Sequence, residues 1–84
     1  MPDKMDPDDV RSRADLAVFL RELAHEAETT EVENGRTSQY LEAASSWATD
    51  CDGAYAHQGE ALPDLSPEAW RFVARLLDAA LVYE

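Results

Sequence analysis

The sequence predicts an all-α protein, a compact three-helix bundle with a mobile acidic N-terminal tail. Three segments repeat apolar residues every three or four positions, a spacing that is typical of amphipathic helices. No segment alternates apolar and polar residues over more than a few positions, as a half-buried strand would. With 84 residues, 45% of them hydrophobic and 30% charged, the chain has the size and composition of one globular domain.

The N-terminal segment and the first helix differ sharply in composition. Residues 1–10 contain four aspartates and two prolines, which predicts a solvated, disordered tail ahead of a single domain over 11–84. We expect the first helix over about 13–28, with Ser12 as its N-cap and Asp15 completing a capping box. Its apolar stripe consists of Leu16, Phe19, Leu20, Leu23, Ala24 and Ala27.

The second helix is expected over about 38–53. Thr37 or Ser38 can cap its N-terminus, and Gly53 is the position where we expect it to end or distort. Its apolar positions are Tyr40, Leu41, Ala44, Trp47, Ala48, Cys51 and Tyr55. The following residues, 56–65, are expected to form a loop.

The third helix, over about 67–83, has the clearest N-terminal signal in the chain. Ser66 is a preferred N-cap residue, Pro67 suits the first helical position, and Glu68 places negative charge at the positive end of the helix dipole. Two adjacent apolar stripes make this helix suitable for a central position in the bundle. We expect Trp47 and Trp70 to be largely buried, since both lie on predicted inner faces.

The charge excludes several classes of function. One lysine and six scattered arginines against 18 acidic residues give a net charge of −11, so a backbone-phosphate contact with nucleic acid and binding to anionic membranes are both disfavoured. The N-terminus lacks the apolar region of a targeting segment, and no apolar run approaches membrane-spanning length. The single cysteine excludes an internal disulfide framework and indicates a cytoplasmic protein.

The acidic residues are concentrated in one part of the sequence. No lysine or arginine occurs between Arg36 and Arg71, whereas six carboxylates do. We therefore expect a non-enzymatic interaction module, resembling a small immunity or inhibitor protein, that binds a basic protein partner. The residues expected to contact that partner are Glu42, Asp50, Asp52, Tyr55, His57 and Glu60.

Two alternatives remain open at the level of sequence. A small metal protein or enzyme could use Asp50, Asp52, His57 and Glu60, although their spacing fits neither a zinc site nor a calcium loop. Cys51 lies on an apolar stripe, which favours a small buried side chain over a nucleophile paired with His57. A structural homodimer through the third helix, or through the small residues of the second, is the other alternative. The sequence thus predicts no catalytic residue, no cofactor and no metal ligand.

A set of short motifs resembles a family of small bacterial proteins known only as a domain of unknown function. The motifs are Val32-Glu33-Asn34, Trp47, Asp52-Gly53-Ala54-Tyr55, Trp70 with Phe72, and the C-terminal Ala80-Leu81-Val82-Tyr83-Glu84. The resemblance covers about residues 15–84, and the chain departs from the family pattern at Val32, where that pattern has tryptophan. It implies a compact, mainly helical fold in a stand-alone bacterial protein and implies no activity.

Overall fold

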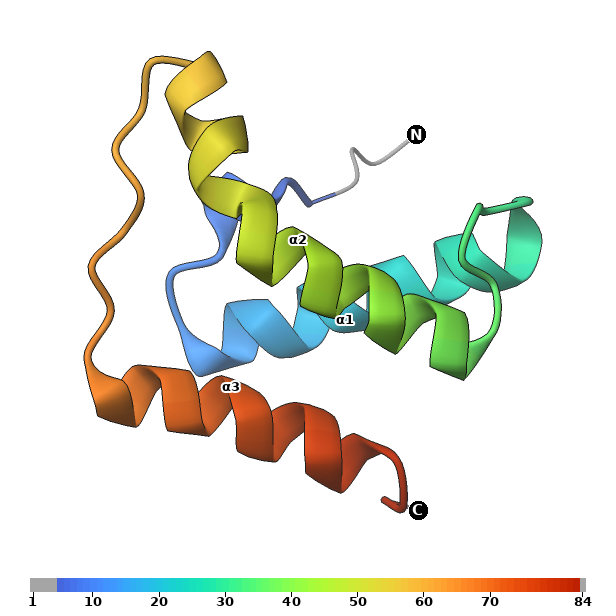
Figure 1. Cartoon of the computed structure of the whole chain (residues 1–84). Helices are drawn as coiled ribbons and strands as arrows, with labels where there is room; N and C mark the ends of the chain where they lie inside the picture. Colours follow the sequence, from blue (N-terminus) through green and yellow to red (C-terminus); the bar gives the residue numbers. More distant parts are fainter. Residues whose placement is uncertain (1–4, 84) are drawn as a thin grey trace. The chain divides into compact units, whose positions relative to one another are not determined.

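The computed structural model describes residues 5–83, which contain a short 3-10 helix and three α-helices and no strand (Figure 1). The 3-10 helix η1 comprises Pro7–Asp9, and the α-helices comprise Arg13–Thr29 (α1), Thr37–His57 (α2) and Pro67–Ala80 (α3). The predicted all-α class is therefore confirmed. The chain divides into two compact units between Ser46 and Trp47, a boundary that falls within α2.

In the first unit, the segment ahead of α1 has local structure. The Asp6 carboxylate accepts a hydrogen bond from the Asp8 N–H at 2.9 Å, and the Asp9 carboxylate accepts one from the Asp6 N–H at 3.1 Å. These bonds form a capping box around η1. The Met5 N–H also donates to Glu22 Oε1 at 2.8 Å, which connects this segment to α1. Of the predicted mobile tail, residues 1–4 lie outside the described residues.

Helix α1 begins as the sequence predicts. Ser12 Oγ accepts a hydrogen bond from the Asp15 N–H at 3.0 Å, which confirms Ser12 as the N-cap. The predicted capping box is not completed, because the Asp15 carboxylate accepts from the Arg11 N–H at 3.1 Å, one residue before the cap. At the other end, Thr29 Oγ1 donates to the His25 carbonyl at 2.8 Å, within the last turn of the helix.

The start of α2 differs from the prediction, because neither Thr37 nor Ser38 is its N-cap. Thr37 is already helical, and the carbonyl of Arg36 accepts the first helical hydrogen bond, from the Tyr40 N–H at 2.8 Å. Gln39 Oε1 accepts from the Arg36 N–H at 3.3 Å, which is one half of a capping box. The guanidinium of Arg36 has no acceptor atom and cannot supply the other half.

The end of α2 is also wrong in the prediction, because the helix continues through Gly53 to His57. The Gly59 N–H donates to the Ala56 carbonyl at 3.0 Å, and the Glu60 N–H donates to the Tyr55 carbonyl at 2.9 Å. Gly59 has a φ of +76°. These features form a Schellman motif, in which a glycine in the left-handed region closes the helix. The expected loop accordingly begins at Gln58.

Helix α3 confirms its predicted start and ends earlier than predicted. Ser66 Oγ accepts from the Ala69 N–H at 3.1 Å, and Pro67 is the first helical residue. The helix ends at Ala80 instead of Tyr83, because the Leu81 and Val82 N–H groups bond three residues back, to Asp78 and Ala79. This tighter turn closes the helix, and Val82 and Tyr83 are left exposed.

Large apolar side chains are less buried than expected. Among the described residues, Cys51 is the one hydrophobic residue that is buried, with 8% of its surface exposed. Trp47 and Trp70 are 57% and 51% exposed, so the expectation that both are largely buried is wrong. In the second unit, Trp47 packs against Tyr55, with ring centroids 6.4 Å apart and tilted by 56°.

The two glycines provide a direct test of where α2 ends. We expect Gly53→Ala to stabilise the protein by about 0.5–1 kcal/mol, because a helix-interior glycine costs that much relative to alanine and its Cβ would meet open space. Gly59→Ala should destabilise it by about 1 kcal/mol, because its positive φ is costly for a residue with a Cβ. Urea unfolding of the two variants measures both changes. Equal effects of the two variants, or a destabilising Gly53→Ala together with a stabilising Gly59→Ala, would contradict the assigned helix end.

Candidate functional site

The structure places most of the predicted partner-binding residues on α2. Glu42 lies in the first unit, whereas the other five lie in the second: Asp50, Asp52, Tyr55 and His57 on the helix and Glu60 just after its C-terminal cap. The carboxylates and His57 are exposed, and Tyr55 is half-buried. Every one of the charged side chains is therefore accessible to a partner.

Because the helix extends to His57, the residues of the second unit fall on different faces. Asp50 and His57, seven positions apart, lie on one face, whereas Asp52 and Tyr55, three positions apart, lie on another. Asp52 Oδ1 also accepts a hydrogen bond from the Gly53 N–H at 3.0 Å. The segment thus presents two small polar surfaces on α2 instead of one convergent cluster.

The same geometry bears on metal binding and on nucleophilic catalysis. Within residues 5–83, no three His, Cys, Asp or Glu side chains come together in a group that could hold a metal ion. Cys51 and His57 are six positions apart on a helix and so point in different directions. Cys51 Sγ instead donates to the Ala48 carbonyl at 3.5 Å, which satisfies the buried thiol within its own helix.

Metal titration tests the alternative use of this segment. We expect the melting temperature to stay unchanged when zinc, calcium, magnesium or manganese is added, because Asp50 and Asp52 point to different faces and cannot share an ion. A metal held by the folded state would raise the melting temperature by mass action. Differential scanning fluorimetry measures the response. A rise that disappears in the Asp50→Asn variant would restore the metal hypothesis.

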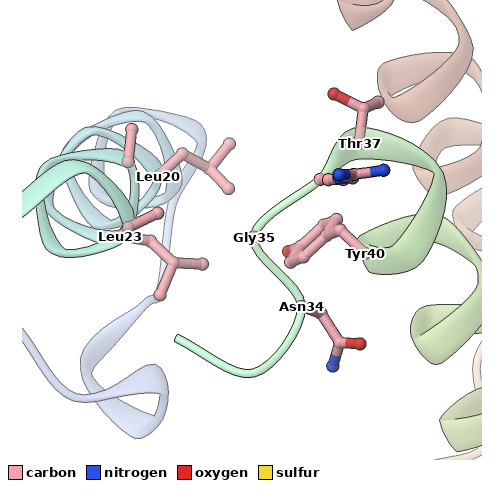
Figure 2. Close-up of a pocket in the computed structure, with 9 residues that line it drawn as sticks. Leu20, Leu23, Asn34, Gly35, Thr37 and Tyr40 are labelled. Atoms are coloured by element: carbon pink, nitrogen blue, oxygen red, sulfur yellow. The ribbon is translucent and has the colours of Figure 1, made fainter. Parts of the chain in front are cut away.

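The first unit contains a feature that the sequence analysis did not predict, an open cavity of about 300 Å³ (Figure 2). Leu20 and Leu23 project from α1 toward Gly35 and Tyr40, as Figure 2 shows. An adjoining hollow of about 230 Å³ shares Leu23 and Tyr40 with the cavity. The other residues that line one or both hollows are Ala24, Glu26, Ala27, Val32, Glu33, Asn34, Arg36 and Thr37.

The cavity follows from local features of the sequence. Residues of the apolar stripe of α1 form one wall, and the turn at Asn34-Gly35 with the start of α2 forms the other. All three residues of the Val32-Glu33-Asn34 motif line the adjoining hollow. In the sequence these residues form only an apolar helix stripe and a short motif that contains Asn34, so the cavity was not predicted. The signal that could have indicated the cavity is the position of the Val32-Glu33-Asn34 motif a few residues after the apolar stripe of α1.

Glutamates are numerous around this cavity. Between Arg21 and Arg36 the sequence has no lysine or arginine, and it has five glutamates: Glu22, Glu26, Glu28, Glu31 and Glu33. Glu26 and Glu33 line the hollow, whereas Arg36 lines the part of the cavity next to α2. The cavity is therefore lined by one basic residue, Arg36, and the adjoining hollow by two acidic residues, Glu26 and Glu33.

None of the helices within residues 5–83 combines the length and the apolar composition that a bilayer span needs. The described residues form a small all-α fold with two acidic regions. One lies on α2, and the other lies at the hollow that adjoins the cavity.

Comparison with known proteins identifies its family. The chain belongs to a family of unknown function, DUF7660, whose model matches residues 12–84. The predicted membership of an uncharacterised domain family is confirmed at that level. No curated protein and no solved structure matches the chain.

Proposed function

We propose that this protein is a non-enzymatic interaction module that binds a basic protein surface, in the manner of a small immunity or inhibitor protein. The observation that supports the proposal is the distribution of charge on α2 and the loop after it. Asp50, Asp52 and Glu60 are all exposed, and no lysine or arginine occurs between Arg36 and Arg71 to neutralise them.

Complementary charge is effective for this kind of binding. A surface of one sign steers an oppositely charged partner during diffusion and raises the rate of association. With the two faces of α2 occupied by Asp50 and Asp52, and with Glu60 at its end, a basic partner can contact the helix from more than one side. His57 and Tyr55 lie beside these carboxylates and would provide polar and aromatic contacts.

Two further properties belong to the same proposal. The single cysteine fits a bacterial protein of the reducing cytoplasm, since such compartments disfavour disulfides. The oligomeric state stays open between a monomer and a homodimer, for which the exposed Trp70, Phe72 and Val73 of α3 are the candidate contacts. A small enzyme or metal protein is less well supported, because the residues it would use lie on different faces of α2.

Neutralising the acidic residues of the second unit tests the proposal. We expect the combined variant Asp50→Asn, Asp52→Asn and Glu60→Gln to lose most of the partner that the unchanged chain captures from its native host at low salt. The reason is that each lost carboxylate removes an attraction that is screened by salt. Affinity capture followed by mass spectrometry and a binding isotherm measures the loss.

A control variant separates this effect from the change in net charge. Asp8→Asn, Glu68→Gln and Asp78→Asn remove three exposed negative charges from other places and should retain the partner. Capture of no basic protein by the unchanged chain would contradict the proposal. Equal loss of the partner in both variants would show that only net charge matters. It would overturn the assignment of Asp50, Asp52 and Glu60 as partner contacts.

A further inference from the structure

We propose that the cavity of the first unit is an anchor site for a basic peptide segment of a partner protein, and that it accepts one bulky apolar side chain flanked by lysine or arginine. This inference rests on the proposed function in its choice of a basic partner. It concerns different residues, those of α1, the 30–36 connection and the first turn of α2. The two sites can therefore be tested separately.

The walls of the cavity are suited to an apolar side chain. Leu20 and Leu23 form one side and the Tyr40 ring lies opposite them (Figure 2). Ala24 and Ala27 leave room between them because their side chains end at Cβ. A volume of about 300 Å³ is at the lower end of the range for ligand sites, which suits one large side chain. In protein interfaces a few such anchors contribute most of the binding energy.

The charges around the cavity select a basic segment. Glu26 and Glu33 line the adjoining hollow, and Glu22, Glu28 and Glu31 belong to the same stretch, which has no lysine or arginine. A cation beside the anchor would be attracted to these carboxylates and can also interact with the face of Tyr40. An acidic segment would be repelled by them. Charge complementarity thus determines the class of occupant.

Arg36 makes the distribution of charge around the cavity uneven. Arg36 lines the cavity itself, whereas Glu33 lines the adjoining hollow, and the guanidinium repels a cation placed beside it. Its role at the helix start uses only backbone atoms, which bond to Tyr40 and Gln39. The side chain can therefore be changed without loss of the cap. Reversing its charge should strengthen binding of a basic segment, an effect that a purely structural residue would not produce.

The probe is a short blocked peptide with tryptophan between two pairs of lysines, titrated into the full chain labelled with ¹⁵N. We expect it to shift the backbone amide signals of Leu23, Ala27 and Gly35. A peptide with alanine in place of tryptophan should bind roughly tenfold more weakly or less, because the anchor is lost. A peptide with glutamates in place of the lysines should not bind.

Variants of the cavity complete the test. Ala24→Phe fills the cavity and should weaken binding of the tryptophan peptide by about tenfold. Ala17→Phe is the matched control, on the same face of α1 and outside the cavity, and should leave binding unchanged. Arg36→Glu should strengthen binding roughly two- to fivefold, which keeps the test decisive if Ala24→Phe fails to fold.

Other results would overturn the inference. These are the absence of peptide binding, equal binding of the acidic peptide, and weaker binding to Arg36→Glu. Shifts confined to residues 50–60, lost in the combined Asp50, Asp52 and Glu60 variant, would also overturn it while leaving the proposed function intact. Binding at the cavity together with no capture of a basic protein by the α2 surface would instead contradict only the proposed function.

Discussion

The closure of α2 at Gly59 determines how the acidic part of this protein is presented. Two backbone hydrogen bonds, from Gly59 to Ala56 and from Glu60 to Tyr55, satisfy carbonyl groups at the end of the helix. Only the positive φ of Gly59 permits that arrangement without strain. Because the helix reaches His57, Tyr55 and His57 are held on the same helix as Asp50 and Asp52. A helix ending at Gly53 would instead leave His57 on a loop.

This constraint changes the interpretation of a net charge of −11. Negative charge on a flexible loop contributes mainly to solubility, whereas charge at fixed positions on a helix can match the charges of one partner. The same reasoning applies to the first unit, where Glu26 and Glu33 line a hollow with apolar walls. Each unit thus combines exposed carboxylates with an accessible aromatic side chain, Tyr40 in one and Trp47 in the other. Both combinations favour recognition of basic surfaces.

Short-range signals in the sequence correctly predicted the presence of three α-helices in the described part of the chain and where α1 and α3 begin. Ser12 and Ser66 cap α1 and α3 because a serine hydroxyl reaches an N–H group three residues later, an interaction that needs no distant partner. The prediction that α2 ends at Gly53 was wrong, because Gly59 can also end a helix. Which of the two glycines ends the helix depends on whether the following residues complete the hydrogen bonds of the Schellman motif. Periodicity gives no information on that point, so α2 was predicted too short.

The candidate site was less predictable. The exposed carboxylates could be identified from charge alone, but the positions of Tyr55 and His57 relative to them depended on the helix end and were not predicted. The cavity depends on how the turn at Asn34-Gly35 returns the chain against α1, which apolar spacing does not encode. The tryptophans were expected to be buried because apolar patterning shows which residues share a face. It does not show whether that face is covered, and both are about half exposed.

The claim on which this account depends most is that α2 is one helix through Asp50, Asp52 and His57 that closes at Gly59. Backbone NMR of the full chain, with Cα chemical shifts and NOEs between residues three apart, measures this residue by residue. The account predicts helical Cα shifts and continuous NOEs through His57, ending at Gly59. Coil shifts from Gly53 onward, with no NOEs between residues 53–57, would contradict it. They would show that His57 lies on a loop.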